Sequence, residues 1–312
     1  MHYLRGMSAW KNIRRKIRYR FIYVMVRVMI VLSNLMPRKW WLAVCGTLGG
    51  LAYNFAKRSR KIVFNNLKMA YAHQDEAFRK SLARKTFVML GRNAGDVLRA
   101  FPITDYARYR KFRIIKGEHF LEEAFKKGRG VLFLTAHLGA FEFVATEMAF
   151  RGYKPLIIGT AMKDERLTKL LWQQRSKLGA TAIERGKETV RLIKTLKSGG
   201  TVAILIDQDT KVKSVFVDFF GHACATPVGA ALLALRTGAA VVPVFVHMGN
   251  DGMQYITCYP EVEVEQTGNE EEDIRINTQK FTSIIEQEIR KYPEQWVWMH
   301  ERWKTQPEQA WS

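Results

Sequence analysis

From about residue 113 onward, short apolar segments alternate with amphipathic ones, and this alternation constrains the fold more than any other feature of the chain. Val131–Thr135, Lys154–Ile158 and Val202–Ile206 have the length and apolar content of buried strands. Helices are predicted at residues 139–150, 164–178, 186–197, 227–237 and 270–291, and further strands at 241–246, 254–258 and 262–264. Strands that alternate with helices form a largely parallel or mixed sheet covered on both faces. We therefore expect an α/β fold with a mixed, largely parallel sheet flanked by helices.

The first quarter of the chain carries most of its excess positive charge. The chain has 50 Lys and Arg against 29 Asp and Glu, a net charge of +21. No acidic residue precedes Asp75, and residues 1–74 hold 15 of the basic ones. An anionic membrane surface or a nucleic acid attracts such a segment. No known nucleic-acid-binding module is visible, so we expect an anionic membrane and no nucleic acid as the partner.

Two apolar runs, Phe21–Met36 and Trp40–Ala56, lie within this basic segment and are separated by Pro37. Both fall short of the roughly 20 residues that a spanning helix needs. Arg27 at the bilayer centre would cost about 2.5–3.5 kcal/mol. We expect residues 1–60 to form a membrane anchor, either one tilted span or an interfacial helical hairpin. The alternative is a buried amphipathic helix in a soluble basic protein.

The remainder, residues 61–312, is expected to be a catalytic domain on the cytoplasmic side of the membrane, because basic flanks face that side. Its first part, residues 61–100, has helical periodicity, and Asp75 is a candidate cap for a second helix there. The three cysteines, Cys45, Cys224 and Cys258, are too few and too scattered for a disulfide framework or a cysteine-rich zinc site. We expect them to be small buried hydrophobes.

The sharpest chemical signal is the segment from Thr135 to Glu142 (TAHLGAFE), where an apolar strand ends and a helix begins. Sites in α/β folds lie at such strand ends. His137 can take a proton from a hydroxyl, and a carboxylate at Glu142 can orient the imidazole. Taken alone the spacing is weak, because an isolated His and Glu occur together by chance. The chain has no Ser in a G-x-S-x-G turn and no Cys beside His137, which favours direct transfer over a covalent acyl-enzyme.

The H-x4-E segment resembles the H-x4-D/E motif of glycerolipid and lipid A acyltransferases. Three further blocks follow in the order of that family, at Asp207–Gly221 (DQD, then SVFVDFFG), at Ala225–Val244 (ATPVG, then RTGAAVVPV) and at Pro293–Lys304 (PEQWVWMHERWK). Together with the basic N-terminal segment, the resemblance covers most of the chain. The chain therefore resembles a lipid A biosynthesis late acyltransferase of the lauroyl/myristoyl type.

The resemblance implies a glycerolipid-acyltransferase-like fold at the cell inner membrane. It implies an acyl–acyl carrier protein as donor, a phosphorylated, Kdo-bearing lipid A precursor as acceptor, and neither a metal nor another cofactor. His137 would be the general base and Glu142 its support. Asp207 and Asp209 match the acidic motif of the family and would orient the basic side chains that hold the phosphates of the acceptor. A solvated turn or a capping pair is the alternative for these two aspartates.

The chain departs from the family at Thr160, where many members carry an arginine. Lys163 or Arg166 would supply that charge, and Arg175 and Arg185 match basic positions further along; each is equally well a surface charge. The departure leaves other acceptors open, namely a lysophospholipid, an aminolipid or a mannosylated phosphoinositide. A non-catalytic lipid-binding homologue is the alternative from another class.

The aromatic residues of the last blocks admit two interpretations. Trp296, Trp298 and Trp303 are expected to pack in the core or at the membrane interface and to have no catalytic role. Phe216, Phe219 and Phe220 fit either an acyl groove or the core.

Overall fold

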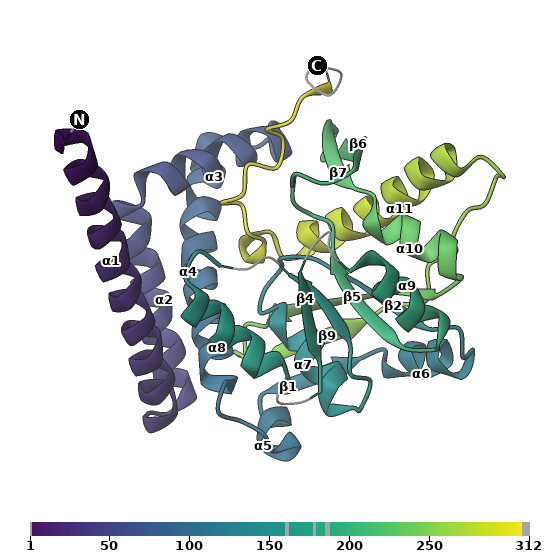
Figure 1. Cartoon of the computed structure of the whole chain (residues 1–312), viewed down its shortest axis with the longest axis horizontal. Helices are drawn as coiled ribbons and strands as arrows, with labels where there is room; N and C mark the ends of the chain where they lie inside the picture. The colour runs from purple at the N-terminus through teal and green to yellow at the C-terminus, as the bar shows by residue number, and fades with distance from the viewer. Residues whose placement is uncertain (1, 160–161, 177–178, 185–187, 308–312) are drawn as a thin grey trace.

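The computed structural model describes residues 2–159, 162–176, 179–184 and 188–307, and Figure 1 shows the chain with its N-terminal helices beside an α/β body. The N-terminal quarter is helical, with α1 (His2–Leu35), α2 (Arg38–Phe55), α3 (Lys57–Ala70) and α4 (Glu76–Ala100). Pro37 separates the first two helices, as the sequence predicts. Asp75 caps α4 by accepting a hydrogen bond from Phe78 N at 2.6 Å, which confirms the predicted cap.

α2 and α4 pack closely because glycines line their contact. A Cβ atom at Gly49 would lie 2.2 Å from the carbonyl oxygen of Phe87, and the space around Gly91 on α4 is equally narrow. Arg38, at the start of α2, makes a buried ion pair of 2.6 Å with Asp96 on α4. The glycines of the second apolar run therefore fasten that run to the body of the protein.

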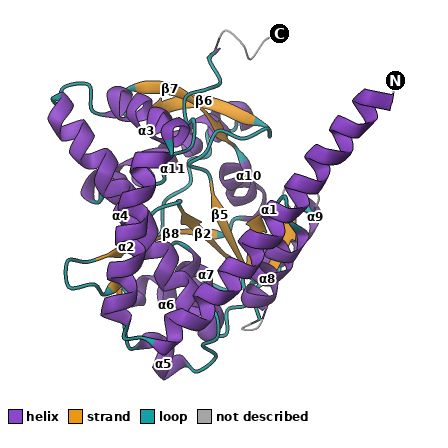
Figure 2. Cartoon of the chain, turned by 90° about the vertical axis from the view of Figure 1, so that its left-hand side faces the viewer, coloured by secondary structure: helices purple, strands orange, loops and turns teal. Residues whose placement is uncertain are grey.

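α1 leans away from the body, and its N-terminal end projects beyond the rest of the chain (Figure 2). Among the described residues, no helix is both long enough and apolar enough to cross a bilayer. Among the 34 residues of α1, Arg18 and Arg20 precede the apolar run that starts at Phe21, and Arg27 interrupts it. The membrane-spanning form of the predicted anchor therefore has no support in the structure.

Within the described residues, seven strands form one sheet in the order β1-β9-β8-β2-β5-β3-β4. The strands are β1 (Arg113–Lys116), β2 (Val131–Thr135), β3 (Leu156–Gly159), β4 (Thr181–Glu184), β5 (Thr201–Leu205), β8 (Ala240–Met248) and β9 (Gln254–Cys258). All neighbouring pairs are parallel except β8 and β9. The predicted α/β fold with a mixed, largely parallel sheet is therefore confirmed.

Helices cover both faces of this sheet. Alternate residues of β2 point to opposite sides, so that Leu132 and Leu134 belong to one buried cluster and Val131 and Phe133 to another. The first cluster includes α9 (Thr189–Lys197), α10 (Gly229–Thr237) and α11 (Glu270–Lys291), and the second includes α5 (Tyr106–Arg110), α6 (Glu118–Lys126) and α7 (Glu142–Phe150). α8 (Glu165–Ser176) packs beside β4. All three cysteines are buried and free, as predicted.

Some elements differ from the sequence-based predictions. The end of the Asp207–Gly221 block and the start of the Ala225–Val244 block form an antiparallel hairpin of β6 (Ser214–Phe219) and β7 (His222–Pro227), which was not predicted. The predicted strand at 262–264 is reduced to a single bridge between Val262 and Val241. The helix predicted from residue 139 begins at Glu142, because residues 136–141 form a turn at the end of β2. That turn carries His137.

Candidate active site

A cavity of about 730 Å³ opens where β2, β3 and β5 end. β3 pairs with β4 along its full length, but with β5 only at Leu156 and Ile157, so β3 and β5 separate toward their C-terminal ends. Ile158 on β3 and Ile204 on β5 line the space that results. The cavity thus lies at the strand ends where α/β folds place their ligands.

The turn that carries His137 is fixed by main-chain contacts. Gly139 has φ +57°, and a Cβ atom there would lie 2.3 Å from the carbonyl oxygen of Val246, so only glycine fits. Gly139 N donates to Gln295 O at 2.9 Å, and Val297 N donates to His137 O at 3.2 Å. The segment 295–297 therefore lies along the turn and holds it in place.

Asp207 orients the imidazole of His137. Its Oδ1 lies 2.8 Å from His137 Nδ1, and its Oδ2 accepts from His137 N at 2.8 Å and from Trp296 Nε1 at 2.8 Å. An ionised carboxylate only accepts, so Nδ1 carries the proton and Nε2 is the basic nitrogen. The side chain of His137 is 21% exposed and lines the cavity. A general base with this orientation can act on a hydroxyl bound there.

The Asp207 carboxylate is held as an anion. The side chain is buried, and burial alone would raise its pKa. The attraction of a protonated His137 and the hydrogen bonds from His137 and Trp296 outweigh burial and lower the pKa of Asp207 to about 2. The anion can therefore stabilise an imidazolium that forms on His137.

Glu142 does not take the orienting position that the sequence spacing predicts for it. Among the described residues, no hydrogen bond joins His137 and Glu142; Glu142 instead accepts from Arg175 Nη2 at 2.6 Å and from Arg175 Nε at 3.0 Å. The reason is that Glu142 begins α7, whereas Asp207 lies two residues beyond the end of β5, the strand beside β2. The orienting carboxylate thus comes from another strand of the sheet.

Arg175 reaches the cavity from α8. Its side chain is 12% exposed, and the two nitrogens bound to Glu142 form a bidentate fork. A Cβ atom at Gly159 would lie 3.3 Å from Arg175 Nη1, so the guanidinium packs over the end of β3. Arg175 therefore places a fixed positive charge in the cavity wall.

The other predicted substrate-binding residues have different positions. Asp209 lies in the cavity wall, where its Oδ2 accepts from Thr305 N at 2.9 Å and its carbonyl oxygen accepts from Lys304 Nζ at 2.9 Å. Lys163 is exposed and Arg166 pairs with Asp164 at 2.6 Å, and neither lines the cavity. Arg185 and Thr160 lie outside the described residues.

Three lysines of the cavity wall were not predicted as site residues. Lys211 and Lys213 belong to the segment before β6, and Lys304 belongs to the C-terminal block. All three are exposed. The sequence signal for Lys211 and Lys213 is the alternation of lysines just after the D-Q-D motif, whereas Lys304 ends the C-terminal block.

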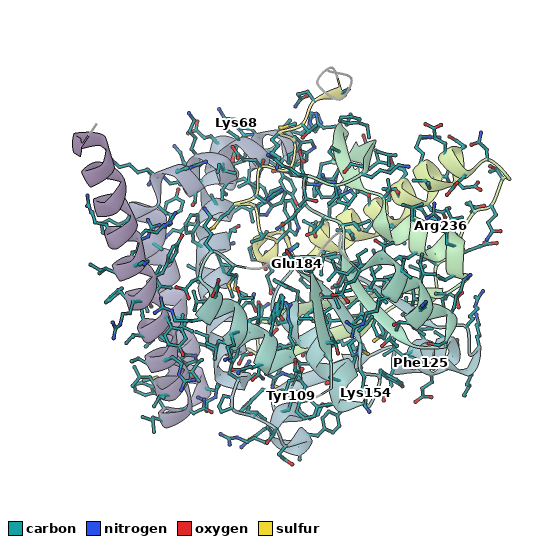
Figure 3. All side chains as sticks on the ribbon, viewed as in Figure 1. Lys68, Tyr109, Phe125, Lys154, Glu184 and Arg236 are labelled. Atoms are coloured by element: carbon teal, nitrogen blue, oxygen red, sulfur yellow. The ribbon has the colours of Figure 1, made fainter. Side chains whose placement is uncertain are left out.

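The part of the cavity wall formed by β5 and the helices α9 and α10 is apolar, and we call it the apolar arm. Apolar side chains from three elements line it, namely Ile204 of β5, Leu192 and Ile193 of α9, and Leu232 and Leu233 of α10. Glu184 and Arg236, which also belong to the cavity wall, are labelled in Figure 3. Phe219 and Phe220 lie outside the cavity wall, in the core. Within the described residues, no group of three or more His, Cys, Asp or Glu side chains is arranged to hold a metal ion.

Comparison with known proteins gives one consistent family. A sequence profile of the family described as bacterial lipid A biosynthesis acyltransferase matches residues 9–305. The lipid A biosynthesis lauroyltransferase of Escherichia coli (strain K12) is 32% identical over 275 residues, which cover 85% of this chain and 85% of that protein. The lipid A biosynthesis palmitoleoyltransferase of the same organism is 28% identical over 264 residues, 83% of each chain. A phosphatidylinositol mannoside acyltransferase of Mycolicibacterium smegmatis is 27% identical over 249 residues, 73% of this chain and 79% of that protein.

Proposed function

The chain belongs to the bacterial lipid A biosynthesis acyltransferase family, and on that premise we propose that it transfers a fatty acyl chain from an acyl–acyl carrier protein to a hydroxyl of a phosphorylated, Kdo-bearing lipid A precursor. Membership of the family supports acyltransferase activity and a role in lipid A biosynthesis. One observation carries the proposal furthest: His137, with Nδ1 bound by Asp207, lines the same cavity as the apolar arm.

The reaction begins when His137 Nε2 takes the proton of the hydroxyl on a 3-hydroxyacyl chain of the acceptor. The hydroxyl oxygen attacks the thioester carbonyl, and a tetrahedral intermediate forms. When the intermediate collapses, the C–S bond breaks and the imidazolium returns its proton to the carrier thiolate. The products are an acyloxyacyl ester and free carrier thiol. Asp207 stabilises the imidazolium and keeps the tautomer fixed.

Two sets of cations serve the two kinds of negative charge in this reaction. Arg175, which Glu142 holds in the cavity wall, interacts with the oxyanion that develops on the thioester carbonyl. Lys211, Lys213 and Lys304 at the rim interact with the phosphates of the acceptor. Asp209 fixes Lys304 through its carbonyl oxygen.

The apolar arm holds the acyl chain of the donor. Gly229 and Arg236 of α10, both in the cavity wall, are seven positions apart, which corresponds to about 10 Å of helix. Aliphatic side chains along this length exclude water from an acyl chain. The bulk of Leu232 and Leu233 therefore sets the length of chain that fits.

Helices α1 and α2 place the enzyme on its membrane. Exposed apolar side chains repeat at helical spacing on both, and we call this surface the N-terminal apolar face: Phe21, Val24, Val28, Val31 and Leu35 on α1, and Trp40, Val44, Leu48, Leu51 and Phe55 on α2. Exposed basic residues, including Arg14, Arg15 and Lys39, accompany it. Such a face fits the interface of an anionic membrane, the inner membrane on its cytoplasmic side.

The second candidate is the same chemistry on another acceptor. The similarity to the phosphatidylinositol mannoside acyltransferase favours a mannosylated phosphoinositide among these. A non-catalytic lipid-binding homologue is less well supported, because the His137–Asp207 pair and the cavity are both present.

An acceptor competition tests the proposal. The purified protein is incubated with radiolabelled acyl–acyl carrier protein and equal amounts of Kdo-bearing lipid A precursor, lysophospholipid and mannosylated phosphoinositide. A parallel reaction supplies the acyl group as its coenzyme A thioester. We expect label in the lipid A product, and only with the carrier-protein donor. Label in another lipid would overturn the acceptor, and equal use of both thioesters would overturn the donor.

A further inference from the structure

The C-terminal block brings a tryptophan to the carboxylate that orients His137. Its segment 295–297 lies antiparallel to the turn 137–139, with a bridge between Leu138 and Trp296. The main-chain bonds of this segment hold the turn on both sides of the bridge. From the middle of the segment, Trp296 Nε1 donates to Asp207 Oδ2 at 2.8 Å. A residue that was expected only to pack is thus in contact with the polar core of the site.

We propose that Trp296 is a positioning residue for acyl transfer: its indole N–H fixes the plane of the Asp207 carboxylate, and the carboxylate fixes the imidazole of His137. This inference rests on the proposed function, in which His137 is the base. It adds a residue outside the H-x4-E and D-Q-D motifs to the machinery.

The carboxylate needs this donor because its own torsion is soft. The terminal torsion of an aspartate has a broad preference, so hydrogen bonds decide the orientation of the two oxygens. Oδ2 of Asp207 accepts from His137 N and from Trp296 Nε1, and these two donors turn Oδ1 toward His137 Nδ1. Asp207 is only 2% exposed, so water cannot replace a lost donor without disturbing the packing.

The indole is itself held rigidly. Trp296 is 1% exposed and packs edge-to-face against Trp298, with ring centroids 4.6 Å apart, and against Phe219 at 5.7 Å. The neighbouring Gln295 side chain donates to Met248 O and accepts from Met248 N, both at 2.8 Å, which ties the segment to the end of β8. Because its donor is held rigidly by this packing, Trp296 fixes the Asp207 carboxylate before substrate binds.

The test removes the indole N–H of Trp296 and keeps an aromatic ring at that position. Trp296→Phe removes the donor, and Trp298→Phe is the matched control, because Trp298 is equally buried in the same aromatic cluster but donates to Pro293 O. We expect kcat of Trp296→Phe to fall about tenfold or more, with unchanged KM for both substrates. Trp298→Phe should keep its kcat. Equal kcat values of the two variants, or a change in KM alone, would overturn the proposal.

A second comparison separates positioning from general packing. In an Asp207→Ala background, which removes the acceptor of Trp296 Nε1, Trp296→Phe should cause no further loss, because the donor acts only through that carboxylate. A further tenfold loss in this background would overturn the proposal. If Trp296→Phe does not fold, β-(3-benzothienyl)alanine at position 296 keeps the shape of the indole and lacks the N–H, and the same results are expected.

The assay uses whichever acceptor the wild-type protein acylates, so that a wrong acceptor leaves this test intact. A wild-type protein that acylates no acceptor, or an active His137→Ala variant, would refute the proposed function itself. Loss of the difference between Trp296→Phe and Trp298→Phe would refute only the role of Trp296.

Discussion

At the scale of single residues, the Glu142–Arg175 pair gives the cavity a charge whose position is fixed. Both side chains are mostly buried, at 18% and 12% exposure. A guanidinium offers two parallel N–H groups to a carboxylate, and a lysine cannot reproduce this geometry. The pair therefore does more than neutralise Glu142, because it also fixes where the cation can meet an oxyanion.

We predict that Arg175→Lys lowers kcat/KM for acyl transfer about 100-fold, the loss expected when one oxyanion contact is removed. Arg166→Lys is the control, because Arg166 lies on the same helix and pairs with Asp164, but outside the cavity. Steady-state kinetics on both variants measure the effect. A comparable loss of kcat/KM in Arg166→Lys would contradict the specific role of Arg175, because it would show that a residue outside the cavity wall matters equally.

His247 makes the stability of the protein depend on pH. It is 7% exposed and stacked on Tyr292, with centroids 3.7 Å apart, and on Tyr255 at 5.2 Å. Burial lowers the pKa of His247 to about 4, against about 6.5 in an unfolded chain. Between these values the unfolded state binds more protons, so protonation favours unfolding.

The contribution of His247 to the free energy of unfolding should therefore be fully present above pH about 6.5. It should decrease as the pH falls toward 4, by up to ~3 kcal/mol. Urea denaturation at pH 7 and pH 4.5 measures the loss. His247→Gln should lose less stability over the same interval, because it has no proton to bind. Equal losses in the two proteins would contradict the assignment.

At the scale of secondary-structure elements, α1 and α2 carry the N-terminal apolar face, and exposed basic residues lie near it. Among the described residues, neither helix contains a membrane-spanning segment. Burial of apolar side chains in the interface and attraction of basic residues to anionic lipids both contribute to membrane binding. Each basic residue near the surface contributes about 1 kcal/mol.

The triple variant Phe21→Glu, Trp40→Glu and Phe55→Glu should reduce binding to vesicles with anionic lipids at least tenfold, because three charges enter the face. Sedimentation with vesicles measures the effect, and binding of the wild type should weaken with salt. Phe78→Glu on α4 is the control for a lost exposed aromatic residue elsewhere. Unchanged binding of the triple variant would rule out this face as the membrane contact.

The elements that the sequence predicts well are those whose periodicity is uninterrupted. The strand at Val131–Thr135 and the helix at 270–291 have the predicted bounds, because an apolar run and a capped amphipathic pattern mark them. The hairpin of β6 and β7 was missed because its residues also belong to a recognisable motif block, which gave no strand boundaries. β4 was missed because its four residues, TAIE, carry too little apolar pattern.

The candidate site was predictable only in part. His137 follows from its place at a strand end, and Asp207 from its motif, but their contact depends on β5 lying beside β2. Sequence spacing favours Glu142 as the partner because it compares residues along the chain and not across the sheet. The contact of Trp296 with Asp207 joins residues 89 positions apart, and no local pattern encodes it.

At the scale of the whole molecule, α8 connects the N-terminal helices to the cavity. Arg166 of α8 lies over the ring of Tyr23 on α1, at 5.4 Å from its centroid, and further along the same helix Leu171 and Arg175 line the cavity. If the N-terminal apolar face binds the membrane as we propose, a lipid at that face is one helix away from the cavity that His137 lines. This arrangement fits a transferase that takes its acceptor from the bilayer and its donor from solution.

The central claim is that His137 removes the proton of the attacking hydroxyl in an acyl transfer to a lipid. The most direct measurement is the transfer of radiolabelled acyl groups from acyl–acyl carrier protein to the lipid A precursor by purified wild-type and His137→Ala proteins, with circular dichroism confirming equal folding. We predict labelled product with the wild type and a rate at least about 100-fold lower with the variant. A folded His137→Ala protein that transfers at the wild-type rate would contradict the account.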